Sequence, residues 1–91
     1  MRLRFTRPAA RQLERTLDHI AAHSLQGAHH VRERLRAVLD MVRAYPLLGQ
    51  ETARRGTRRI MASPYPYAVT YRVAADEIIV LGVRHAARRP P

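Results

Sequence analysis

The segment that decides the fold is the last third of the chain, which reads GTRRIM (56–61), PYPYAVTYRV (64–73) and DEIIVLGVRH (76–85). In the middle piece, the residues from Tyr67 to Val73 alternate between large apolar and smaller or polar side chains, a pattern typical of a strand with one buried face. The last piece is apolar on both faces, which indicates a central or well-covered strand. The segment therefore predicts three consecutive strands joined by short turns.

The residues before this segment predict one strand and two helices. Arg2 to Thr6 alternates in the same way, and apolar residues then recur at helical spacing over 10–21 and 28–42. Thr6 and Ser24 are placed to cap these helices, and residues 47–56 are expected to form a loop. The order is β-α-α-β-β-β, which predicts an α+β fold with a helical hairpin packed on an antiparallel sheet. The residues expected in the core are Leu13, Leu17, Leu35, Leu39, Val69 and Leu81.

Length and composition narrow the class of protein. The 91 residues predict a single domain spanning 1–91 with one modest core. The chain has no cysteine, which excludes disulfides and thiolate metal ligands. We see no secretory leader and no apolar stretch long enough to span a bilayer, so we expect a cytoplasmic protein with no membrane partner.

The charge of the chain points to its partners. The net charge is +10, and all 17 basic residues are arginine. Arginine presents a planar fork of donors that binds carboxylate or phosphate through two hydrogen bonds. A small chain this basic is expected to attract a polyanion or an acidic protein.

The element order, together with the sequences GTRR (56–59), PYAVTYRV (66–73) and VLGVRHAARR (80–89), resembles the RelE/ParE toxin superfamily. The resemblance is closest to the ParE branch, known for plasmid stabilisation. It implies the toxin of a bacterial type II toxin–antitoxin module that inhibits DNA gyrase and is neutralised by a cognate acidic antitoxin. It also implies a homodimer, or a heterotetramer with the antitoxin, as the assembly to consider.

The RelE branch of the superfamily supplies an enzymatic alternative, a ribosome-dependent mRNA endonuclease. In that reaction the 2′-hydroxyl attacks the neighbouring phosphate without a metal, and the enzyme provides an acid, a base and cations. The residues available are His85 as acid or base and Arg58, Arg72 and Arg84 as cations. The tail after His85 has no aromatic residue to stack on an unpaired base, and arginine is too basic to donate protons. A third hypothesis is a basic interaction domain of the same fold without toxic activity.

The candidate site residues are arginines on or beside the predicted strands. On an antiparallel sheet, alternation allows Arg72 and Arg84 to share a face, with either Arg58 or Arg59 beside them. The candidates for binding gyrase are Arg58, Arg59, Arg72, Arg84, Arg88 and Arg89. The simpler alternative is a solvated fringe of charges at the strand ends. His19 and His23 have a spacing that can bind a metal on a helix, but no third ligand is evident, so we expect neither a metal nor a cofactor.

Overall fold

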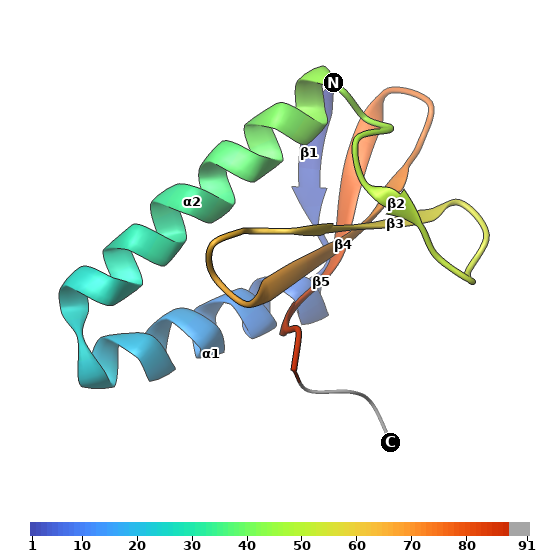
Figure 1. Ribbon diagram of the computed structural model, residues 1–91. Helices are drawn as coiled ribbons and strands as arrows, with labels where there is room; N and C mark the ends of the chain where they lie inside the picture. Colours follow the sequence, from blue (N-terminus) through green and yellow to red (C-terminus); the bar gives the residue numbers. More distant parts are fainter. Residues whose placement is uncertain (88–91) are drawn as a thin grey trace.

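The computed structural model describes residues 1–87 and shows two helices and a five-stranded sheet (Figure 1). The strand order in the sheet is β1-β5-β4-β3-β2. Both helices lie on one side of the sheet, so the predicted α+β fold is confirmed. The elements are β1 (Arg2–Phe5), α1 (Arg7–His23), α2 (Leu25–Ala44), β2 (Gln50–Glu51), β3 (Thr57–Met61), β4 (Tyr67–Val73) and β5 (Glu77–His85). The short strand β2 lies inside the segment that was expected to be a loop.

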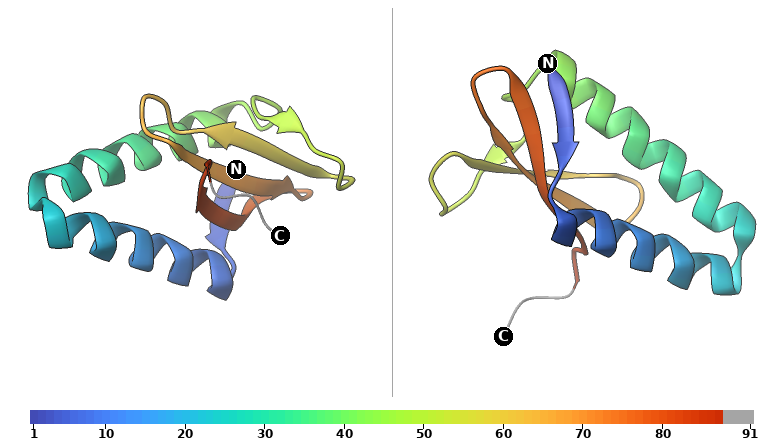
Figure 2. Two further views of the ribbon diagram at one scale, coloured as in Figure 1. Left: turned by 60° about the horizontal axis from the view of Figure 1, so that its bottom comes forward. Right: turned by 180° about the vertical axis from the view of Figure 1, so that it is seen from behind.

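The two helices begin at the residues that the sequence predicts. The side-chain oxygen of Thr6 accepts a hydrogen bond from the amide of Ala9 at 3.2 Å, and that of Ser24 accepts one from Gly27 at 2.9 Å. Each bond pairs an amide that has no partner inside its helix. The helices meet at Ser24 and diverge from there toward the sheet (Figure 2).

The sheet is mixed, whereas the sequence predicted a wholly antiparallel one. β1 runs parallel to β5, with Phe5 opposite Val80, and the other pairs are antiparallel. The alternation in β1 shows which face is buried but carries no information on strand direction. Beyond Val80, β5 has no β1 residue beside it, and α1 fills this position. There the side-chain Oε1 of Gln12 accepts a hydrogen bond from the amide of Val83 at 2.9 Å.

The core lies between the helices and one face of the sheet. Leu17, Leu35, Leu39 and Val69 are buried as predicted, and Leu13 packs at the margin of the core. The prediction for Leu81 is wrong, because a bulge in β5 places Val80 opposite Tyr71 and Gly82 opposite Thr70. The extra residue shifts the alternation, so that Val80 and Val83 face the core.

Candidate binding surfaces

Three of the arginines predicted to bind a target lie on the same face of the sheet, the one opposite the helices. We call this face the open face, because no helix of the described residues packs on it (Figures 1 and 2). Arg59 is opposite Thr70 on the neighbouring strand, and Arg72 follows Thr70 by two residues. Arg59 and Arg72 are therefore diagonal neighbours on adjacent strands, a relation that places their Cα atoms about 7–8 Å apart. Arg84 on β5 is opposite Ala68 and belongs to the same face.

The cations of the open face are largely unpaired. Arg59, Arg72 and Arg84 are exposed and make no hydrogen bond or ion pair with residues 1–87. Arg4 on β1 forms an ion pair with Glu77 at 3.1 Å. The positive charge of this face is thus available to a partner.

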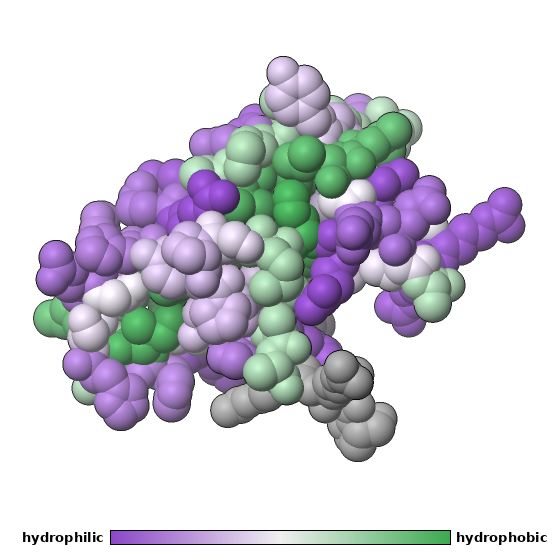
Figure 3. All heavy atoms as spheres, viewed as in Figure 1, coloured by the Kyte–Doolittle hydropathy of each residue, from purple (hydrophilic) through white to green (hydrophobic). Residues whose placement is uncertain are grey.

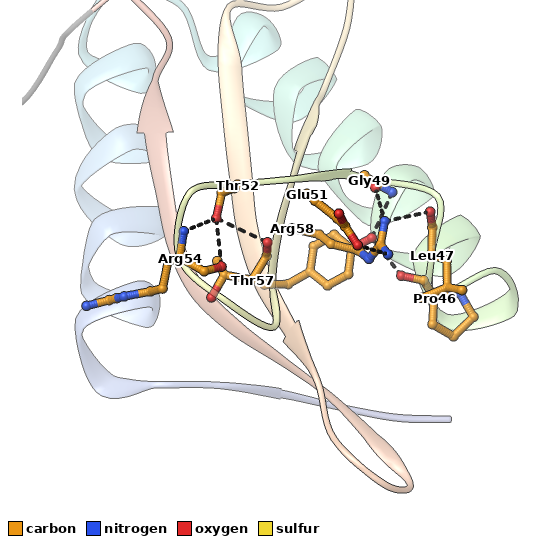
Figure 4. Close-up of polar contacts among 9 residues, drawn as sticks. Pro46, Leu47, Gly49, Glu51, Thr52, Arg54, Thr57 and Arg58 are labelled. Atoms are coloured by element: carbon orange, nitrogen blue, oxygen red, sulfur yellow. Dashed lines mark hydrogen bonds and ion pairs between the residues drawn. The ribbon is translucent and has the colours of Figure 1, made fainter.

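Arg58 has a different role, because it points to the other side of β3. Its Nη1 donates to the carbonyl oxygens of Leu47 at 3.3 Å and Gly49 at 2.8 Å, and its Nη2 contacts Glu51 Oε1 at 3.3 Å (Figure 4). Its side chain is 20% exposed. Arg58 therefore fixes the loop between α2 and β2, and the sheet separates it from Arg72.

Tyr71 also holds this loop, through two hydrogen bonds that were not predicted from the sequence. Its fully buried hydroxyl group donates to the carbonyl oxygen of Pro46 and accepts from the amide of Gly49, both at 2.8 Å. A Cβ atom on Gly49 would lie 2.8 Å from this hydroxyl oxygen, so the approach requires glycine. This role could have been expected from the sequence, because a tyrosine predicted to be buried needs a hydrogen-bond partner for its hydroxyl group.

The loop presents apolar side chains to solvent at the end of α2. Leu47 is 68% exposed and Tyr45 is 69% exposed. Met1 lies nearby, because the Nε of Arg43 in the last turn of α2 donates to its carbonyl oxygen at 3.0 Å. Apolar spheres gather over this part of the molecule (Figure 3). We call this surface the apolar end, and its residues are Met1, Met41, Tyr45, Leu47 and Leu48.

The four candidate residues of the mRNA endonuclease alternative do not form a single site. His85 is opposite Tyr67 on the covered face, with the ring centres 5.4 Å apart, and its Nδ1 accepts from the amide of Ala87 at 3.1 Å. Arg72 and Arg84 point to the open face. The sheet thus lies between the candidate acid or base and two of its three candidate cations. Arg88 and Arg89 lie outside the described residues.

His19 and His23, whose spacing can bind a metal on a helix, both lie on α1. The rings of His19 and His23 are 5.5 Å apart, but within residues 1–87 no group of three or more histidine, cysteine, aspartate or glutamate side chains could hold a metal ion. In the same part of the chain, no helix has the length and apolar character to cross a membrane.

The fold and its two exposed surfaces define a small α+β domain that offers a basic face and an apolar end to partners. The family described as "ParE toxin of type II toxin-antitoxin system, parDE" matches residues 3–90, and the chain belongs to this family. It is thus the toxin of a type II toxin–antitoxin module, and an antitoxin protein is its expected partner.

Two similar proteins agree with this assignment. "Putative toxin Y4kP" of Sinorhizobium fredii (strain NBRC 101917 / NGR234) is 29% identical over 90 residues, which cover 99% of this chain and 93% of that protein. The solved structure described as "Chromosomal ParDE TA system from P. aeruginosa" matches with a TM-score of 0.67 and 23% identity. That match covers 93% of this chain and 95% of the other, and it shows the common fold.

Proposed function

We propose that the chain inhibits DNA gyrase through the arginines of its open face, and that an acidic antitoxin neutralises it. The family match over residues 3–90 supports the toxin class from which this target is inferred. The observation that favours binding over catalysis is the position of His85 on the covered face, away from Arg72 and Arg84. A toxin that acts by occupying its target needs cations on an accessible surface and no residue that transfers protons.

The apolar end is our candidate for the antitoxin surface. Exposed apolar side chains that lie together on a small protein commonly mark a protein interface. Arg58 and Tyr71 hold the loop that carries Leu47 and Leu48, so this surface exists before a partner arrives. The net charge of +10 favours an acidic segment, and a disordered segment that folds on contact can cover such a surface.

The gyrase proposal is tested by a supercoiling assay with purified gyrase and purified toxin. We expect loss of supercoiling in the presence of the toxin, with mRNA on translating ribosomes left intact. Cleavage of ribosome-bound mRNA with normal supercoiling would favour the nuclease alternative. The absence of both effects would favour the non-toxic interaction domain.

His85→Ala separates the two mechanisms within one assay. We expect growth arrest by this variant to match that of the wild-type protein at equal expression. A nuclease that used His85 as acid or base would lose about 10²–10⁴ in rate. A folded His85→Ala variant that is harmless would therefore contradict the gyrase proposal.

The antitoxin surface is tested with the product of the adjacent gene. Replacing Leu47 and Leu48 by serine should weaken the complex at least tenfold in a binding titration. Leu25→Ser is the matched control, since Leu25 is 79% exposed at the opposite end of α2 and should leave affinity unchanged. Equal affinities for both variants would place the antitoxin elsewhere.

A further inference from the structure

We propose that the open face binds the phosphate backbone of duplex DNA without regard to base sequence. DNA phosphate would then be a ligand of the same arginines through which the chain is proposed to inhibit gyrase. It rests on that function only for its biological setting, because DNA binding can be measured without gyrase.

The charge of the open face is suited to phosphate. β1 contributes Arg2 and Arg4 to this face. The charge of Arg4 is neutralised by its ion pair with Glu77 on β5. Arg59, Arg72 and Arg84 remain without a partner among residues 1–87. Three unpaired guanidinium groups on one rigid sheet can each donate two hydrogen bonds to a phosphate.

The side chains between these arginines are small. Ala68, Thr70 and Gly82 are at neighbouring positions in the register of β4 and β5, and they separate Arg59 and Arg72 from Arg84. Ala68 and Gly82 are themselves buried, so a phosphate backbone would contact the guanidinium groups around them and not the strands beneath. The apolar side chains of this face, Met61 and Ile79, are half-buried, whereas the apolar end offers more exposed anchors to an acidic peptide.

The absence of aromatic side chains favours a duplex over a single strand. Binding of unpaired bases commonly uses aromatic rings as stacking platforms. Phe5, Tyr65, Tyr67 and Tyr71 pack in or against the core, and Tyr45 is at the apolar end. These are all the aromatic residues of the chain, so the open face has none. A duplex presents phosphates and needs no stacking, and contacts to phosphate carry no sequence information.

The test is fluorescence anisotropy of a labelled duplex titrated with the purified full-length toxin at several salt concentrations. We expect a dissociation constant in the range of about 10⁻⁴–10⁻⁶ M near physiological salt, as for non-specific binding. The logarithm of the binding constant should fall with the logarithm of salt with a slope of about −3, for three phosphate contacts. A labelled single strand of the same length should bind more weakly.

The variant Arg59→Glu/Arg72→Glu should lose at least tenfold in affinity, and its salt slope should be smaller by about two. Arg11→Glu/Arg15→Glu is the matched control, because both residues are exposed on α1 and the change in net charge is the same. The control should retain most of the affinity. Circular dichroism melts establish that both variants are folded.

Four results would overturn the inference. They are an undetectable complex with wild-type toxin at low salt, equal losses in the two double variants, tighter binding of the single strand, and tighter binding of polyglutamate of matched charge. Gyrase inhibition without DNA binding would refute this inference alone. DNA binding without gyrase inhibition would refute the proposed function alone.

Discussion

The two faces of the sheet differ in what their side chains do, although the same strands supply both. On β5, Ile78 is fully buried against Val42 and Tyr71, whereas its neighbour Ile79 is partly exposed on the open face. The covered face is apolar and holds the helices in place. The open face carries Arg59, Arg72 and Arg84, which make no hydrogen bond or ion pair with residues 1–87. Stability and binding are therefore assigned to alternate residues of the same strands, and substitutions on the two faces should have separable effects.

The largest expected effect is the loss of stability in Ile78→Ala. Removing this side chain deletes buried methyl groups and leaves a cavity, which should cost about 2–5 kcal/mol. Ile79→Ala is the matched control, one residue away on the other face, and it should cost less than half as much. Urea denaturation of both variants measures the difference. Similar costs for the two would mean that the faces are not distinct in packing.

A smaller effect is expected when the loop that carries the apolar end loses its anchor. Tyr71→Phe removes the hydroxyl group and leaves the buried amide of Gly49 without its partner, which should cost about 1–3 kcal/mol. Tyr45→Phe is the control, because its exposed hydroxyl makes no hydrogen bond within residues 1–87 and should change stability by less than about 0.5 kcal/mol. Equal melting temperatures for the two variants would show that Tyr71 does not hold the loop.

A gain in stability is expected at Thr57, a buried residue opposite Arg72. Its hydroxyl oxygen is inaccessible to solvent and has no hydrogen-bond partner within residues 1–87. Thr57→Val keeps the shape and removes the unpaired polar group, so we expect stabilisation by about 1 kcal/mol. That change corresponds to a rise in melting temperature of about 4–8 °C. A lower melting temperature would reveal a hydrogen bond that forms in solution.

The smallest effect on stability is expected for the arginines of the open face. Arg59→Glu/Arg72→Glu removes no hydrogen bond or ion pair with residues 1–87 and should shift the free energy of unfolding by less than about 0.5 kcal/mol per residue. Denaturant melts of this variant and the wild type provide the measurement. A loss comparable to that of Ile78→Ala would contradict the division of labour between the faces.

The sequence predicted the covered face better than the sites. Hydrophobic periodicity and the caps at Thr6 and Ser24 located both helices, because they are local signals. The bulge that removes Leu81 from the core depends on the pairing of β4 with β5, and no local pattern encodes it. The parallel pairing of β1 was missed for the same reason.

For the site, alternation together with an assumed register was enough to predict that Arg72 and Arg84 share a face. Sequence alone could not decide between Arg58 and Arg59 as their neighbour. Register places Arg59 on the open face, and Arg58 points to the loop carbonyls. The apolar end was not predicted, because it joins residues from the N-terminus, from α2 and from the loop after it.

The most direct test of the account compares growth after induction of two variants, each with and without the adjacent antitoxin gene. Leu47→Ser/Leu48→Ser should arrest growth in both conditions, because the toxin stays active while neutralisation is weakened. Arg59→Glu/Arg72→Glu should be harmless in both conditions, although it remains folded and binds the antitoxin. The opposite pattern, with a harmless leucine variant and a fully toxic arginine variant, would contradict the assignment of toxicity to the open face and neutralisation to the apolar end.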